Sequence, residues 1–323
     1  MSQSTHETTA PPSGRRNALA YLAIGVFGLV APFAFPGFMT QIAFLWIFVV
    51  LALTWDTAGG QMGYNSFGNI LFFGIGMYTT AVLQVGLYFD VGDYNAAQGA
   101  AGFVLTQTQY FIGIGVGLAA AAVLALLCAA VFGAGLLGLR GHYFAIGTLG
   151  LGIAAGEIAA SWNWIGAGSG MVTPLYPGPI DDRRLFFYFL SFALAVVTFF
   201  ALKRLYASRF GLAINAIRDD EDKAEAMGLH TTRYKTVAWS ISAFFLGIAG
   251  GIVGTIVGFI DPRDVAFAGI TYGVWMVLMA ILGGKGTLWG PVIGAAVFHI
   301  TQELFWTYLL GWQRVALGLL IVL

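Results

Sequence analysis

Residues 203–235 read KRLYASRFGLAINAIRDDEDKAEAMGLHTTRYK and form the most charged part of the chain. They contain seven of the fifteen Lys and Arg residues and five of the fifteen Asp and Glu residues, and the sequence on either side is mostly apolar. A segment this charged between long apolar runs must lie outside a lipid bilayer. Because cytoplasmic loops are enriched in Lys and Arg, its basic residues place it on the cytoplasmic side.

The middle of this segment predicts a short helix over approximately residues 219–227. Asp219 or Asp220 can cap its N-terminus, where acidic residues also suit the positive end of the helix dipole. Gly228 is expected to lie just past its C-terminus, in the left-handed conformation that favours glycine. Judged by charge alone, the segment would be interpreted as a solvated connector between two membrane helices.

The composition indicates an all-α polytopic membrane protein. The chain is 59% hydrophobic and only 9% charged, whereas soluble domains are about 25% charged. Acidic and basic residues are equal in number, so no nucleic-acid partner is indicated. Membrane lipid is the expected surrounding, and the single cysteine, Cys128, cannot form an internal disulfide.

The apolar runs predict about ten transmembrane or re-entrant helical segments, because a spanning helix needs about 20 residues. They cover residues 18–38, 40–56, 66–89, 110–137, 143–160, 185–202, 236–260, 267–282, 287–305 and 315 onward. The fifth and eighth runs are short enough to be re-entrant. Residues 1–16 are predicted to be a disordered cytoplasmic tail, residues 17–323 one transmembrane domain, and residues 161–184 a periplasmic loop. The sequence stops inside an apolar run, which leaves open a further C-terminal tail.

The basic residues also predict the orientation. With a cytoplasmic N-terminus and ten crossings, eleven Lys and Arg residues lie inside and four lie outside, as the positive-inside rule requires. The expected location is therefore a bacterial inner membrane, crossed several times from a cytoplasmic N-terminus.

Glycine-rich stretches interrupt the apolar runs at residues 59–69 and 283–291. Broken membrane helices free backbone groups that can face a substrate path. Polar side chains are costly in lipid, and we predict that those of the first stretch line a translocation path: Gln61, Asn65, Ser66 and Asn69. The alternative is that glycine lets helices pack closely, which we favour for Gly250, Gly254 and Gly258.

Glu157 is a further candidate for the translocation path. Ionisable residues within membrane segments are rare and often functional. This carboxylate lies near the outer end of the predicted segment 143–160, where it can meet the ammonium of an amino acid. The alternative is an interfacial position that water reaches.

Several stretches, in order, resemble the permease component of branched-chain amino acid ABC importers. They are GQMGYNSFGNILFFGIGMY at 60–78, LRGHYFA at 139–145, the tryptophan- and glycine-rich stretch at 162–171, EAMG at 225–228 and the glycine-rich block at 283–295. The first departs from the family's pattern at Asn69, where the family often has His, and at Met77, where it often has Ala. These departures leave the substrate undetermined but do not affect the resemblance to the family.

The resemblance implies an ABC importer permease fold and a coupling helix in segment 203–235 that docks on an ATPase. The residues implied in coupling are Arg218, Asp219, Asp220, Ala224, Glu225, Ala226, Met227 and Gly228. The implied partners are a second homologous permease, two cytoplasmic ABC ATPases that bind ATP and magnesium, and a periplasmic substrate-binding protein. Whether the two permeases are identical stays open. The implied substrates are branched-chain or other hydrophobic amino acids, with urea or short-chain amides as the alternative.

Other functions find little support in the residues. GGKGT at 283–287 lacks the spacing of a phosphate-binding loop, so we expect no nucleotide or other cofactor on this chain. The four histidines are scattered and indicate no metal site. An ion-coupled secondary transporter would need paired charges deep in the membrane, and the sequence indicates none. The chain is therefore interpreted as a transport subunit rather than an enzyme.

Overall fold

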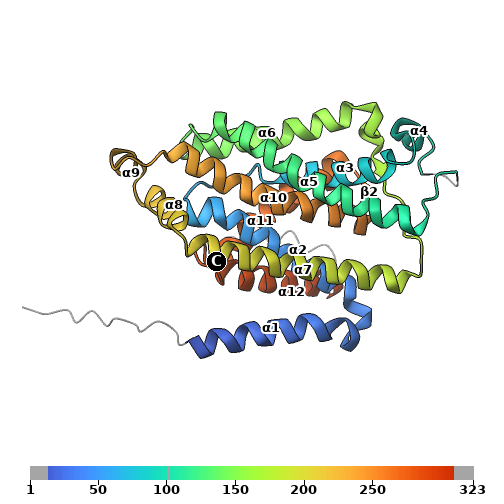
Figure 1. Ribbon diagram of the computed structural model, residues 1–323, viewed down its shortest axis with the longest axis horizontal. Helices are drawn as coiled ribbons and strands as arrows, with labels where there is room; N and C mark the ends of the chain where they lie inside the picture. Colours follow the sequence, from blue (N-terminus) through green and yellow to red (C-terminus); the bar gives the residue numbers. More distant parts are fainter. Residues whose placement is uncertain (1–13, 100–101, 309–323) are drawn as a thin grey trace, which may run out of the picture.

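The computed structural model describes residues 14–99 and 102–308, which are predominantly helical (Figure 1). The α-helices are α1 (Gly14–Ala34), α2 (Met39–Asp56), α3 (Ile70–Gly86), α4 (Val91–Ala96), α5 (Gln107–Leu136), α6 (His142–Ser161), α7 (Ile180–Tyr206), α8 (Arg209–Asp219), α9 (Glu221–Ala226), α10 (Thr231–Val257), α11 (Val274–Gly283) and α12 (Gly290–Tyr308). Shorter 3-10 or π turns are η1 (Pro36–Phe38), η2 (Thr57–Gln61), η3 (Asn163–Ile165), η4 (Ala167–Ser169), η5 (Pro262–Ala266) and η6 (Gly269–Gly273). Strands β1 (Met171–Val172) and β2 (Phe259–Ile260) pair antiparallel, with Met171 opposite Ile260.

The long helices run side by side along one axis, and short elements gather at its two ends. Figure 1 shows α8 and α9 at one end, which we call the α9 end, and α4 at the other, which we call the α4 end. Near the start of α1, the Tyr21 ring stacks on Trp289, and the Nζ of Lys203 lies 4.4 Å from the centre of the Tyr21 ring. The N-terminal helix therefore starts at the α9 end, as the predicted topology requires.

The hydropathy of the helices confirms a multi-pass helical membrane protein. Within the described residues, six helices are long and apolar enough to cross a membrane: Pro36–Gln61, Gln107–Leu136, His142–Ser161, Ile180–Tyr206, Thr231–Val257 and Pro262–Gly283. The helices Ala20–Ala34 and Ile70–Gly86 are apolar but shorter. The predicted count of about ten is not confirmed, because only these six qualify within the described residues. The tenth predicted segment lies outside those residues. The same holds for residues 1–13 of the predicted N-terminal tail.

Three predicted boundaries differ from the structure for local reasons. The predicted segment 66–89 becomes helical only at Ile70, because the backbone before it is irregular and Gly63 adopts a φ of 79°. The predicted segment 267–282 starts with the turn η6 rather than with α-helix, and α11 begins only at Val274, while η5 lies just before the segment. The polar loop after residue 90 contains α4, whose first turn Asp90 caps by accepting a hydrogen bond from the Asp93 N–H at 2.9 Å.

Glycine allows the three central helices α3, α5 and α10 to approach closely. A Cβ on Gly250 of α10 would overlap the Phe73 carbonyl of α3, and one on Gly247 would overlap the Ala121 carbonyl of α5. Small residues at such crossings are the usual way in which membrane helices pack. The packing role predicted for Gly250 is therefore confirmed, and Gly254 also lies close to Met77. The packing role predicted for Gly258 is wrong, because a Cβ there meets no atom within 4 Å and this glycine instead ends α10 in the left-handed conformation.

This packing predicts that Gly250→Leu destabilises the protein. Overpacking of a filled interior costs about 1–3 kcal/mol, and here the obstacle is backbone that cannot rotate away. Gly115→Leu on α5 is the matched control, because a Cβ there meets no atom within 4 Å. Thermal unfolding of the purified proteins in detergent should show a lower midpoint for Gly250→Leu only. Equal midpoints for both variants would contradict the packing role.

Candidate functional site

Helix α9 is a single short helix with a defined cap at each end. Asp220 precedes it in extended conformation, and its carboxylate accepts a hydrogen bond from the Lys223 N–H at 3.0 Å. At the other end Gly228 has a φ of 90°. The N–H groups of Gly228 and Leu229 bond back to the carbonyls of Glu225 and Ala224, which is the Schellman arrangement. The helix and both predicted caps are confirmed, although the helix begins two residues later than predicted.

A buried lysine joins α9 to the membrane helices. The side chain of Lys235, in the second turn of α10, is only 1% exposed. Its ammonium donates to Glu221 Oε1 at 2.6 Å, to the Leu137 carbonyl at 2.6 Å and to the Tyr64 hydroxyl at 3.0 Å. The Tyr64 hydroxyl in turn donates to the other oxygen of Glu221. All three ammonium protons are therefore used, and the side chain ties α9 to the end of α5 and to the stretch before α3.

Arg140, which follows α5, forms exposed ion pairs with α9. Its guanidinium lies 2.6 Å from Asp222 and 3.7 Å from both Glu221 and Glu225. Because it is half exposed, each contact contributes little by itself. Together these contacts hold the α5–α6 junction against the first and last turns of α9.

Local interactions set the ionisation of this cluster. Burial opposes the ionisation of Glu221, but hydrogen bonds from Lys235 and Tyr64 outweigh it and hold the pKa of this carboxyl below its usual range. Burial, together with the hydrogen bond to Glu221, raises the pKa of the Tyr64 phenol. The hydrogen bond to Asp222 and the Glu221 charge raise the pKa of Arg140. At neutral pH the cluster therefore holds an ionised carboxylate and a neutral phenol.

The glycine-rich stretches meet beside this cluster. The Gly286 N–H donates to the Asp56 carboxylate at 2.7 Å, which brings the loop after α11 against the end of α2. Arg218 of α8 contacts the stretch between α2 and α3, because its side chain lies against Gly63 and its guanidinium is 3.5 Å from the Gly60 carbonyl. Arg218 thus packs α8 directly against the irregular backbone between α2 and α3.

The eight residues that the sequence predicts for coupling divide into two groups. Ala224 is buried against this chain and is not available to a partner. The side chains of Asp219 and Glu225 are exposed, those of Arg218 and Asp220 are partly exposed, and Met227 reaches 86% exposure. Ala226 and Gly228 are also exposed. The outward side of α9 therefore presents a mixed apolar and charged surface, whereas its inward side is held by contacts within this chain.

The residues predicted for the translocation path lie in different surroundings. Gln61, Ser66 and Asn69 are buried. Asn69 accepts a hydrogen bond from the Trp239 indole at 2.8 Å, and the Ser66 carbonyl accepts one from the Trp55 indole at 2.7 Å. Asn65 is exposed, and Glu157 is exposed far along α6 toward the α4 end. The five residues thus do not form one cluster, and their role as a lining stays a prediction.

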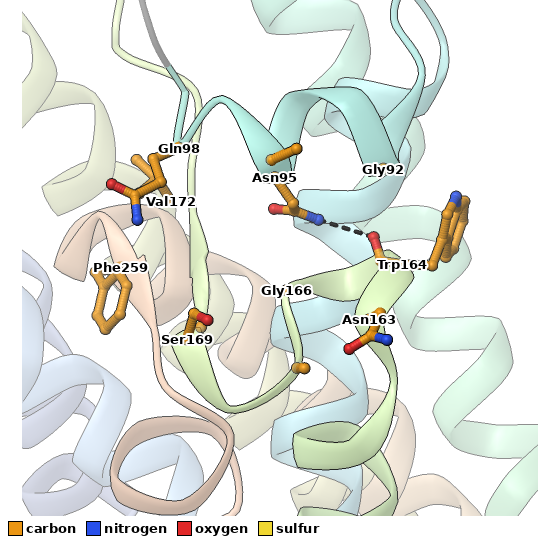
Figure 2. A pocket seen from close by; sticks show the side chains of 12 residues that line it. Gly92, Asn95, Gln98, Asn163, Trp164, Gly166, Ser169, Val172 and Phe259 are labelled. Atoms are coloured by element: carbon orange, nitrogen blue, oxygen red, sulfur yellow. Dashed lines mark hydrogen bonds between the residues drawn. The ribbon is translucent and has the colours of Figure 1, made fainter.

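The α4 end contains an open cleft. Its volume is about 640 Å³, and it is lined by Gly92, Asn95, Ala96, Gln98, Asn163, Trp164, Gly166, Ala167, Ser169, Gly170, Val172 and Phe259 (Figure 2). The Asn95 side-chain amide donates to the Trp164 carbonyl at 2.9 Å, which joins α4 to the loop after α6. The predicted periplasmic loop 161–184 thus forms one wall of a recess with mixed polar and apolar lining at the end opposite α9.

Comparison with known families agrees with this arrangement. The family model for the permease component of branched-chain amino acid transport systems matches residues 38–323. The chain belongs to this family. The match includes the broken stretch before α3, the α8–α9 segment and the glycine-rich loop after α11, which are the parts that meet at the α9 end.

Individual relatives are similar over most of the chain. The high-affinity branched-chain amino acid transport system permease proteins LivM of Escherichia coli and Salmonella typhimurium are 27% identical over 291 residues, or 81% of this chain and 66% of theirs. The probable permease protein LivM of Methanocaldococcus jannaschii is 24% identical over 82% of this chain and 80% of its own length. The permease protein LivH of Escherichia coli is 31% identical over 35% of this chain and 37% of its own. The chain thus spans about two thirds of the length of the first relatives. No solved structure matches it significantly.

Four residues of the site were absent from the sequence-based prediction: Tyr64, Arg140, Glu221 and Lys235. Arg140 and Tyr64 lie inside stretches that were recognised, but no local pattern assigns them a partner. Lys235 closes the charged segment at the start of an apolar run, and a lysine there indicates an interfacial side chain. Its burial depends on partners far away in the sequence.

Breaking the buried pair should destabilise the protein strongly. Lys235→Met leaves the Glu221 carboxylate without its main partner, and the loss of one member of a buried pair costs about 3–5 kcal/mol. Lys223→Met removes an exposed pair with Asp220, which is worth about 0–1 kcal/mol, and serves as the control. We expect the double variant Lys235→Met/Glu221→Met to recover part of the loss. The measurement is denaturant unfolding in detergent, and equal stability of Lys235→Met and Lys223→Met would contradict the prediction.

Proposed function

We propose that this chain is a permease subunit of an ATP-driven ABC importer that carries branched-chain and other hydrophobic amino acids across the bacterial inner membrane. The observation that supports this most directly is the anchored helix α9. Its inner side is tied through Glu221 to three membrane elements, while Met227 and the neighbouring charges remain exposed. Membership of the permease family supports the substrate class.

The proposal assigns each end of the molecule a partner. ATPase chains, with ATP and magnesium, would contact the exposed side of α8 and α9, and a periplasmic binding protein would contact the cleft at the α4 end. A second permease would complete the transport path. Energetic coupling needs an element with discrete arrangements that both sites influence. The contacts of α9 with α10, with the end of α5 and with the stretch before α3 suit that role.

The proposed topology has about ten segments, with the N-terminus and the α9 end in the cytoplasm. In a Cys128→Ala background, Ala96→Cys should react with a membrane-impermeant maleimide from outside intact cells. Lys223→Cys, at an 84% exposed position on α9, should react only after the inner membrane is opened. Labelling of Lys223→Cys from outside would invert the proposed topology.

Gly228→Val tests the proposed function. Valine is strained at a φ of 90°, at a cost of about 1–3 kcal/mol, although a Cβ there meets no atom within 4 Å. We expect the variant to insert normally but to lose ATPase docking or leucine uptake in reconstituted vesicles. Gly228→Asn is the control, because asparagine tolerates this conformation.

Co-purification of the ATPases reports assembly, and ATP-dependent leucine uptake reports coupling. Parent-like assembly and uptake by Gly228→Val would mean that the segment is only a connector. No leucine uptake by the parent with its ATPases and binding protein would contradict the proposed substrate class.

A further inference from the structure

A second cavity lies in the α6 surface toward the α4 end. Its volume is about 290 Å³, and it is bounded by α6 on one side and by the turns η5 and η6 on the other. Gly152 and Gly156 of α6 line it, and the absence of side chains there leaves its interior open. A cavity near 300 Å³ suits a small metabolite rather than a peptide.

The polar part of this cavity is an accessible ion pair. Arg263 donates from Nε and Nη2 to the two carboxylate oxygens of Glu157 at 3.0 and 2.8 Å. The two side chains are 60% and 56% exposed, so the pair contributes little net stability and a ligand can reach both groups. Asp264 also lines the cavity. Two carboxylates beside one guanidinium favour a ligand that has a cationic end.

The apolar part of the cavity extends away from the ion pair. Ile153 and Leu149 lie about one and two helical turns before Glu157, so Leu149 is roughly 12 Å from it along α6. Ile70 and Phe267 form the facing wall. A ligand held by the charged groups would therefore direct an apolar side chain toward the middle of the membrane segment.

The backbone around the cavity is irregular where a membrane helix would normally continue. Residues 262–266 and 269–273 form π turns, which are rare and frequent at functional sites. Asp261 holds the first turn by accepting hydrogen bonds from the N–H groups of Arg263 and Asp264 at 2.8 and 2.7 Å. Interrupted membrane helices mark substrate sites in many transporters.

We propose that this cavity is a subsite for the zwitterion of an apolar α-amino acid. Glu157 binds the ammonium, Arg263 binds the carboxylate, and the branched side chain packs against Ile153 and Phe267. Without a ligand the two charged groups pair with each other, and the zwitterion replaces that pair with two complementary contacts. The inference rests on the proposed function and adds to it the atoms that recognise the substrate.

Leucine binding to the purified permease–ATPase complex, measured without the binding protein, tests the subsite. The competitors are leucine, 3-methylbutylamine, which lacks the carboxylate, and 4-methylpentanoate, which lacks the ammonium. We expect Glu157→Gln to weaken leucine and the amine at least tenfold and to spare the acid. Arg263→Gln should weaken leucine and the acid and spare the amine. Asp181→Asn/Arg184→Gln, which removes an exposed pair near the same end, is the control and should bind like the parent.

The outcomes separate this inference from the proposed function. If the parent importer takes up leucine with its binding protein but its purified complex shows no saturable leucine binding, the subsite is overturned and the proposed function is not. Equal weakening of both half-ligands by either variant would assign the pair a structural role and also overturn it. Leucinamide has a neutral amide in place of the carboxylate. If it bound as tightly as leucine, Arg263 would not be the group that binds the carboxylate, and the proposed subsite would be overturned. Failure of the parent to take up leucine at all would instead contradict the proposed function.

Discussion

The buried ammonium of Lys235 is the constraint on which the α9 end depends. A charge that is 1% exposed is tolerated only when it is paired and fully hydrogen-bonded. Its three partners come from α9, from the end of α5 and from the stretch between α2 and α3. None of the three elements can shift alone without leaving a buried polar group unpaired.

The two ends of the molecule use charge in opposite ways. At the α9 end the central pair is buried and closed, which suits a mechanical connection between elements. Toward the α4 end the pair of Glu157 and Arg263 is exposed on the surface of the protein and borders a cavity, which suits an exchange of partners with a ligand. Between them, glycine contacts hold α3, α5 and α10 closely together, so the two ends are joined by a tightly packed core.

Local chemistry could be predicted from the sequence, and long-range contacts could not. The Asp220 and Gly228 caps follow from residues within a few positions of each other, and the membrane segments follow from hydropathy. By contrast, Tyr64 and Lys235 are 171 positions apart, and Glu157 and Arg263 are 106 apart. No periodicity relates such pairs. The turn η6 was missed because an apolar run does not distinguish a π turn from a regular helix, whereas η5 falls between two predicted segments, where no helical turn was expected.

Hydrogen exchange of α9 tests most directly whether the Lys235 cluster anchors it. Glu221→Gln keeps the shape of the side chain and removes its charge, so the comparison isolates the ion pair. We predict that the Ala224 and Leu229 amides and the amides of residues 62–69 lose protection together, at least tenfold, while amides in the middle of α10 keep theirs. Unchanged protection of α9 in Glu221→Gln would contradict the claim that this buried pair fixes the helix to the membrane domain.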